Sequence, residues 1–235
     1  CRLKGRFRLK EIKNTNPIAV GDRVVFHQEE APEKGVITEI APRENYIIRK
    51  SVNLSKQTHI LAANIDVAFL VVTLNNPTTY PAFIDRFLVT AEAYSIPAVL
   101  LLNKVDSYSP DELAEVKYMA HMYRDIGYEC IGISAQTGKN IEQVKARLEG
   151  KTAMVLGHSG AGKSTLINRL SPSLQLKTQP LSEQHAQGQH TTTFAQMYDL
   201  DFGARIIDTP GIKGLGVVDF EREEIADYFP EFFAL

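Results

Sequence analysis

The sequence has 235 residues, of which 44% are hydrophobic and 23% charged, and its net charge at pH 7 is −2. A chain of this length and composition is expected to be globular, with one large core or two modest ones. No apolar run approaches the roughly 18 residues of a membrane span, and the N-terminal residues lack the apolar centre of a signal peptide. We therefore expect a cytoplasmic protein with no membrane partner, and a monomer by default.

The two cysteines, Cys1 and Cys130, have neither a metal-binding spacing nor a plausible framework of disulfides, which favours a reducing compartment. Cys130 lies in the segment YECIGIS and is expected in a buried strand. The chain begins with Cys1 instead of Met and ends in the apolar segment DYFPEFFAL, so we expect it to be trimmed at both ends.

The front of the chain is basic. Residues 1–60 carry 12 Lys and Arg against 7 Asp and Glu, whereas residues 61–235 carry 14 against 21. This asymmetry suggests contact with nucleic acid, although a solvated face of a small barrel accounts for it equally well. Short alternating segments predict an OB-like β-barrel here, at residues 5–10, 22–27, 35–40 and 45–50. Alternation would place four arginines on outer faces, namely Arg6, Arg8, Arg23 and Arg49.

Residues 51–65 show no sustained period and are interpreted as a linker, with a domain boundary near Ala63. From Asp66 onward apolar strands alternate with amphipathic helices, which predicts a mostly parallel sheet covered on both faces. The expected strands are residues 66–74, 96–102, 128–134, 152–157, 195–201 and 204–210, and the expected helices are residues 82–95, 109–127, 139–150 and 163–170. Ser109 is the expected N-cap of the second helix.

These patterns divide the chain into three parts. Residues 1–63 are expected to form an OB-like RNA-binding domain with its linker, residues 64–220 an α/β P-loop domain, and residues 221–235 the start of a C-terminal region. In an open α/β sheet, ligands bind at the carboxyl ends of the strands. The candidate site residues follow the ends of the predicted strands.

The stretch GHSGAGKST fits the pattern G-x-x-x-x-G-K-[ST] between an apolar strand and a helix. Its glycines would let main-chain N–H groups approach a phosphate chain, and the helix would point its positive end at the charge. Lys163 is expected to reach the β- and γ-phosphates and Ser164 to offer its hydroxyl to Mg²⁺. The expected nucleotide-binding residues are Gly157, His158, Ser159, Gly160, Ala161, Gly162, Lys163, Ser164 and Thr165, with His158 supporting the conformation of the loop. The flanking strand and helix argue against an ordinary glycine turn.

The segment NKVD at residues 103–106 indicates that the base is guanine. The carboxylate of Asp106 can accept hydrogen bonds from N1–H and N2–H₂ of guanine, a donor pair that adenine lacks. The Lys104 stem can lie over the base, and Asn103 can tie this segment to the phosphate loop. Taken alone the segment is weak, since Asp106 could instead cap the following helix.

A second strand end carries Ser134 and Ala135, and the N–H of Ala135 is expected to reach guanine O6. Taken alone, this pair of residues is almost no evidence for a guanine site. Together the motifs are far less expected by chance, because all of them lie at strand ends of one α/β domain.

Two later segments are candidates for sensing the γ-phosphate. In DTPG at residues 208–211, Asp208 would hold Mg²⁺ through water and the N–H of Gly211 would contact the γ-phosphate. In GQHTTT at residues 188–193, Thr192 would complete the Mg²⁺ shell when GTP is bound. A simple Pro-Gly turn and an ordinary polar loop are the alternatives.

The guanine-reading segments precede the phosphate loop, whereas in most GTPases they follow it. With this permuted order and its basic front domain, the chain resembles the RsgA (YjeQ/YloQ) family of circularly permuted, small-subunit ribosome-assembly GTPases. The resemblance implies GTP hydrolysis to GDP stimulated by the 30S subunit, contacts with 16S rRNA, and a role in late maturation of the decoding region. It also implies a C-terminal Zn²⁺ domain with a Cys/His cluster, whose ligands residues 1–235 do not contain.

The position that carries a water-orienting Gln in many GTPases is Ile212, whose apolar side chain cannot orient water. The resemblance points instead to His190 as the residue that positions the attacking water, against the alternative of an ordinary loop histidine. Lys163 and Mg²⁺ would stabilise the transferred charge, and slow unstimulated turnover is expected.

Two other functions remain open from the sequence. The first is an RNA-binding module whose guanine-nucleotide domain serves as a sensor, with hydrolysis incidental. The second is a P-loop kinase or ATPase, which Asp106 opposes.

Overall fold

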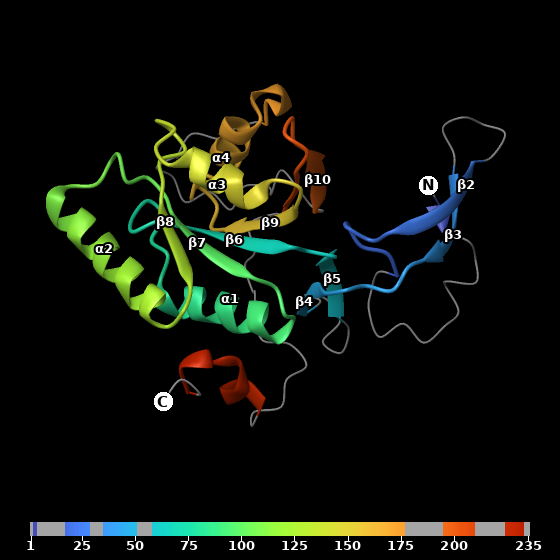
Figure 1. Ribbon diagram of the computed structural model, residues 1–235, viewed down its shortest axis with the longest axis horizontal. Coiled ribbons are helices and arrows are strands. Elements are labelled where there is room, and N and C mark those ends of the chain that lie inside the picture. The colour runs from blue at the N-terminus through green and yellow to red at the C-terminus, as the bar shows by residue number, and fades with distance from the viewer. Residues whose placement is uncertain are drawn as a thin grey trace.

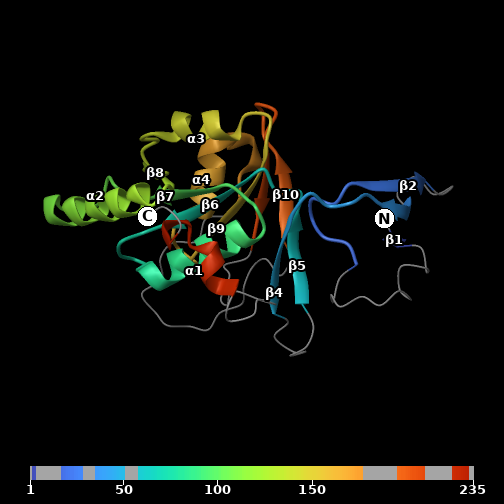
Figure 2. The same cartoon turned by 60° about the horizontal axis from the view of Figure 1, so that its bottom comes forward.

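The computed structural model describes residues 2–3, 17–28, 35–50, 58–176, 195–209 and 224–232. Its N-terminal part consists of strands, as predicted. A three-stranded sheet has the order β1-β3-β2, with β2 antiparallel and β1 parallel to β3, and a two-stranded antiparallel sheet joins β4 and β5. The bounds are β1 (Arg2–Leu3), β2 (Val24–Gln28), β3 (Gly35–Ile40), β4 (Tyr46–Lys50) and β5 (Thr58–Ala63). Figures 1 and 2 show β1 to β3 at one end of the molecule.

The linker prediction is wrong for residues 58–63, which form β5. Alternation fails here because successive residues are buried: Ala62 and Ala63 are both fully buried. Ile47 of β4 and Leu61 of β5 belong to the same hydrophobic cluster as residues of the large sheet. The boundary near Ala63 therefore crosses a continuous core, and the division into domains stays a prediction.

The large sheet has six strands in the order β10-β11-β9-β6-β7-β8. All neighbours are parallel except β10, which pairs antiparallel with β11. The strands are β6 (Val67–Val72), β7 (Ala98–Leu102), β8 (Glu129–Gly132), β9 (Thr152–Gly157), β10 (Gln196–Asp199) and β11 (Arg205–Asp208). The mostly parallel sheet is confirmed, and each strand lies within its predicted segment. Cys130 on β8 is buried, as expected, and burial raises the pKa of its thiol to about 11.

Helices cover both faces of this sheet, as Figure 1 shows. They are α1 (Pro81–Ala93), α2 (Pro110–Asp125), α3 (Ile141–Leu148) and α4 (Lys163–Leu170), with short 3-10 helices η2 (Pro172–Leu174), η3 (Glu224–Tyr228) and η4 (Pro230–Phe232). Buried residues of α1 and α2 share one core cluster with one face of β6, and those of α3 and α4 share a second cluster with its other face. Of the C-terminal elements, η3 packs against α1.

The helix starts follow the local signals. Ser109 caps α2: its side chain accepts a hydrogen bond from the N–H of Glu112, whose carboxylate accepts one from the N–H of Ser109. Pro110 occupies the first turn, where its missing N–H costs no hydrogen bond. In the middle of the sheet β9 runs between β11 and β6, directly after α3, so the phosphate-loop strand is preceded by the helix that the permuted order requires.

None of the helices in the described residues is both long enough and apolar enough to cross a membrane.

Candidate functional site

The phosphate loop has the backbone that its glycines predict. β9 ends at Gly157 and α4 begins at Lys163, with Gly162 as its N-cap. Gly157, Gly160 and Gly162 have φ values of +146°, +83° and +102°, which L-residues rarely adopt. A Cβ on Gly162 would lie 2.3 Å from Nδ2 of Asn103, and one on Gly157 would lie 2.7 Å from the carbonyl oxygen of Val71. Only glycine fits these two positions without displacing its neighbours.

Lys163 lies against its own loop. Its Nζ donates to the carbonyl oxygens of Gly157, at 2.9 Å, and His158, at 3.0 Å. Burial lowers its pKa, while the charge of Asp208 acts in the opposite direction. Of the remaining predicted residues of the loop, Ser159 and Gly160 are exposed, Gly162, Ser164 and Thr165 are half-buried, and Ala161 is buried.

His158 packs on α1. Its ring lies 4.3 Å from the ring of Phe83, centroid to centroid, at an interplanar angle of 32°. Burial and the nearby Lys163 charge lower the pKa of the imidazole. These contacts agree with a role for His158 in holding the conformation of the loop.

Asp208 ends β11 beside the phosphate-loop strand, opposite Val155 of β9. Burial raises the pKa of its carboxyl, and the charge of Lys163 opposes this shift. Oδ1 of Asp208 is buried and has no hydrogen-bond partner among the described residues. The next residue, Thr209, donates its hydroxyl to the carbonyl oxygen of Val155 at 3.1 Å. A buried carboxylate oxygen without a protein partner suits a hard divalent cation such as Mg²⁺, which prefers oxygen ligands.

Asn103 joins three strand-end segments, and its predicted tie to the phosphate loop is confirmed. Its Nδ2 donates to the carbonyl oxygen of Ala161 at 2.8 Å, and its Oδ1 accepts from the N–H of Ala135 at 3.0 Å. Asn103 and both alanines are buried. The N–H of Ala135, which we expected to be directed at guanine O6, is thus already donated to Asn103, because the carboxamide lies between the two loops. Its contact with guanine stays a prediction.

The other residues predicted to read guanine belong to the same two segments as Asn103 and Ala135. Asp106 is exposed, and Lys104 is half-buried with a φ of +69°. The Nζ of Lys104 donates to the carbonyl oxygen of Asn76 in the loop after β6. Burial lowers the pKa of Lys104, against the effect of the Asp106 charge. Ser134 is buried and accepts a hydrogen bond from the N–H of Thr137 at 2.9 Å.

Sequence reasoning missed two residues that hold these loops. The hydroxyl of Tyr108 donates to the carbonyl oxygen of Asn103 at 2.9 Å. Arg169 of α4 donates from Nε to the carbonyl oxygen of Ala135 at 3.2 Å and from Nη2 to that of Gln136. No motif marks either residue, although Tyr108 follows the NKVD segment by only two positions.

Three predicted residues, His190, Thr192 and Gly211, lie outside the described residues. Within the described ranges no three His, Cys, Asp or Glu side chains form a cluster that could hold a metal ion. Of the four predicted outward arginines, Arg23 is exposed and forms an ion pair with Glu44 at 2.7 Å.

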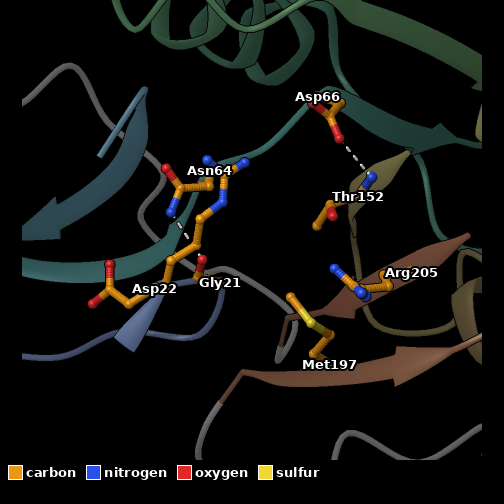
Figure 3. Close-up of a pocket in the computed structure, with 8 residues that line it drawn as sticks. Gly21, Asp22, Asn64, Asp66, Thr152, Met197 and Arg205 are labelled. Atoms are coloured by element: carbon orange, nitrogen blue, oxygen red, sulfur yellow. Dashed lines mark hydrogen bonds between the residues drawn. The ribbon is translucent and has the colours of Figure 1, made fainter. Parts of the chain in front are cut away.

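A separate cleft of about 180 Å³ lies between the N-terminal strands and the opposite, amino-terminal edge of the large sheet. Figure 3 shows Asp66, Thr152 and Arg205 from the sheet facing Gly21 and Asn64. None of the predicted nucleotide residues lines this cleft, so it is distinct from the site at the carboxyl edge.

A family model described as RsgA GTPase matches residues 40–218. The protein named small ribosomal subunit biogenesis GTPase RsgA of Christiangramia forsetii is 69% identical over 235 residues, covering 99% of this chain and 75% of that protein. The protein of the same name from Flavobacterium psychrophilum is 58% identical over 237 residues, covering 100% of this chain and 73% of that protein.

Two solved structures resemble the chain as a whole. YjeQ from Thermotoga maritima has a TM-score of 0.76 and 38% identity, with 99% of this chain and 73% of that one covered. YloQ, described as a circularly permuted GTPase, has a TM-score of 0.66 and 28% identity, with 98% and 69% covered. These likenesses confirm the predicted fold class in outline, an N-terminal part made of β-strands followed by a circularly permuted α/β GTPase domain. The chain belongs to the RsgA GTPase family, a family of GTP hydrolases.

Proposed function

We propose that this chain acts in the cytoplasm as a GTPase of small ribosomal subunit biogenesis. It binds the 30S subunit and its 16S rRNA, hydrolyses GTP to GDP and phosphate, and assists late maturation of the subunit. The observation that carries this proposal is the pair of hydrogen bonds made by the Asn103 carboxamide, which bring the phosphate loop and both guanine-reading segments to one place. The names of its 58–69% identical relatives support the biological role.

In this proposal the phosphate loop holds the phosphates through main-chain N–H groups of residues 157–165. Lys163 exchanges its hydrogen bonds with the carbonyls of Gly157 and His158 for the β- and γ-phosphate oxygens. The phosphates in turn favour the charged form of this buried lysine. Asp106 accepts the donors of guanine, and the Lys104 stem covers the base.

Ser164, Thr192 and Asp208 would hold Mg²⁺. The ion supplies positive charge that neutralises the β- and γ-phosphates. The buried, unpartnered Oδ1 of Asp208 supports this assignment for one of the three residues. Thr192 rests on the sequence pattern alone.

His190 positions the attacking water for in-line attack, and the N–H of Gly211 contacts the γ-phosphate. Lys163 stabilises the charge that develops on the leaving phosphate oxygens. His190 belongs to the polar sequence segment between α4 and β10, and a partner that contacts this segment and helps His190 to position the water is expected to stimulate hydrolysis. A His190→Ala chain that binds GTP normally should lose stimulated turnover, and wild-type turnover would reject this role.

The N-terminal domain contacts rRNA in this proposal. Arg23 supports it, since its guanidinium is exposed and its single hydrogen bond to Glu44 is a surface pair of the kind that contributes at most about 1 kcal/mol. Such a pair is readily exchanged for a phosphate group. Arg43 makes two hydrogen bonds with the buried carboxylate of Asp22 and is expected to be structural.

The alternative function is an RNA-binding module with a guanine-nucleotide sensor domain in which hydrolysis is incidental. The test compares the affinity of the chain for purified 30S subunits in the presence of GDP and of a non-hydrolysable GTP analogue. Tighter binding with the GTP analogue supports a GTPase cycle on the subunit. Equal affinities favour the simple module.

A further inference from the structure

The loop that follows β6, residues 73–79, closes on itself. The N–H of Thr73 donates to Oγ1 of Thr79 at 3.1 Å, and the N–H of Thr79 donates to the carbonyl oxygen of Thr73 at 2.9 Å. The Thr73 hydroxyl donates to the carbonyl oxygen of Pro77 at 2.6 Å. Both threonines are almost fully buried. The loop is thus held in one conformation by its own hydrogen bonds, and none of the sequence motifs accounts for it.

Three hydrogen bonds join this loop to the guanine-reading segment and the start of α2. The N–H of Leu74 donates to the Tyr108 hydroxyl at 2.9 Å, and Nζ of Lys104 donates to the carbonyl oxygen of Asn76. Nδ2 of Asn75 donates to Oε1 of Glu112 at 2.6 Å. The loop therefore supports the guanine-reading segment from the side of β6.

Tyr108 is the link between this support and Asn103. Its hydroxyl accepts from Leu74 and donates to the carbonyl oxygen of Asn103 at 2.9 Å, so both of its hydrogen-bonding capacities are used. The side chain is buried, with 8% of its surface exposed. Burial raises the pKa of the hydroxyl, which therefore stays protonated and remains a donor.

We propose that Tyr108 is a positioning residue for guanine recognition and that residues 73–79 are the rigid support from which it acts. The hydroxyl fixes the main chain at Asn103, whose carboxamide in turn joins the phosphate loop to Ala135. The same segment carries Asp106, so its position relative to the base depends on this hydroxyl. This inference rests on the proposed function, because it assumes that the segment reads guanine.

The test is Tyr108→Phe, which keeps the ring and removes the hydroxyl. Leaving the N–H of Leu74 and the carbonyl of Asn103 without this partner is expected to speed release of a fluorescent GDP analogue about tenfold. The preference for GDP over inosine diphosphate should also shrink, because inosine lacks the 2-amino group that Asp106 is expected to read.

The matched control is Tyr123→Phe. The Tyr123 hydroxyl is also buried and donates to Oδ1 of Asp85 at 2.8 Å, between α2 and α1 and away from the nucleotide loops. The Tyr123→Phe substitution should lower the melting temperature without changing the rate of GDP release or the preference for guanine.

A second variant, Asn75→Ala, removes the hydrogen bond to Glu112 and should speed GDP release by a smaller factor than Tyr108→Phe.

The outcomes separate this inference from the proposed function. If the wild-type chain fails to bind GDP, the proposed function fails. If the wild-type chain binds GDP while Tyr108→Phe and Asn75→Ala both keep its release rate and its preference over inosine diphosphate, Tyr108 is only structural and this inference is overturned. Faster release with reduced base preference in Tyr108→Phe, but not in Tyr123→Phe, supports it.

Discussion

Asn103 donates a hydrogen bond from its side-chain nitrogen to the main-chain oxygen of Ala161 over 2.8 Å, between residues 58 positions apart in the chain. Through this bond the segment that is proposed to read the base is joined to the loop that is proposed to bind the phosphates. Because Asn103 also accepts the N–H of Ala135, a single buried side chain fixes the relative positions of three loops. The arrangement predicts that binding of the base and binding of the phosphates depend on one another.

Replacing Asn103 with Ala should weaken GDP binding by at least about tenfold. The change leaves the N–H of Ala135 and the carbonyl oxygen of Ala161 buried without their partner, at a cost of about 1–3 kcal/mol for each such group. Titration with a fluorescent GDP analogue measures the binding, and thermal unfolding measures the stability.

Asn45→Ala is the control for that experiment. The Asn45 carboxamide also makes two main-chain hydrogen bonds, both with Ile65 at 2.8 Å, in the N-terminal part of the chain. The Asn45→Ala substitution should lower the stability of the chain and leave its affinity for GDP unchanged. Equal effects of Asn45→Ala and Asn103→Ala on GDP affinity would contradict the special role of Asn103.

Gly162→Ala should damage the phosphate loop more than Gly127→Ala damages the end of α2. The two glycines have nearly the same φ, +102° and +100°, so the backbone strain of an L-residue is matched. A Cβ on Gly162 would meet Asn103 at 2.3 Å, whereas one on Gly127 would meet nothing within 4 Å. Thermal unfolding should show a loss of about 1–2 kcal/mol for Gly127→Ala and a clearly larger one for Gly162→Ala. Equal losses of stability would show that the Asn103 side chain can move away from the added Cβ at no cost.

Asp106→Asn should shift nucleotide preference from guanine to xanthine. The amide of Asn offers an N–H donor that suits the 2-oxo group of xanthine, whereas guanine loses a charge-assisted pair of hydrogen bonds. We expect GTP affinity to fall about 10- to 100-fold, the range for hydrogen bonds to a charged group. Competition between GTP and xanthosine triphosphate measures the preference. The control is Asp111→Asn, which changes a nearby exposed aspartate and should leave the preference for guanine unchanged. If Asp106→Asn also left this preference unchanged, the alternative of a P-loop kinase or ATPase would be favoured again.

Asp208→Asn should stabilise the nucleotide-free chain and should abolish the effect of Mg²⁺ on GTP binding. Burial raises the pKa of the Asp208 carboxyl, so its stabilising contribution is complete below the pKa of the unfolded chain and is lost as pH rises through the folded-state pKa. At neutral pH the charged form is therefore unfavourable, and relief of about 1 kcal/mol would raise the melting temperature by roughly 2–4 °C.

Unfolding of both chains measured between pH 4 and pH 8 tests this prediction, and the gain from Asp208→Asn should shrink toward the acid end. GTP binding by Asp208→Asn should no longer respond to Mg²⁺. A variant that is less stable than wild type at neutral pH, or one that still requires Mg²⁺, would contradict the role given to Asp208.

Much of the fold follows from local signals. The strands of the large sheet are continuous apolar runs and its helices have clear periods and caps such as Ser109, so each was predicted from short-range pattern alone. β5 was missed because Ala62 and Ala63 are both buried, which removes the alternation that marks a half-exposed strand. The small side chains give no other signal.

The candidate site likewise contains residues whose roles could be predicted from the sequence and residues whose roles could not. The backbone of the phosphate loop and the tie made by Asn103 could be predicted because they belong to motifs with a fixed spacing. Tyr108 and Arg169 could not, since their roles arise from hydrogen bonds to main-chain atoms of other loops that only the folded chain brings near. A tyrosine or an arginine at these positions has no distinct sequence pattern.

The most direct test of the account is GTP hydrolysis by the purified chain with and without purified 30S subunits. We predict slow turnover by the chain alone and strong stimulation by the subunit, because the position that carries a water-orienting Gln in many GTPases is the apolar Ile212 and the proposed water-positioning residue, His190, is expected to act when the subunit is bound. Fast multiple turnover without subunits, or GTP binding with no stimulation by them, would contradict a ribosome-dependent GTPase.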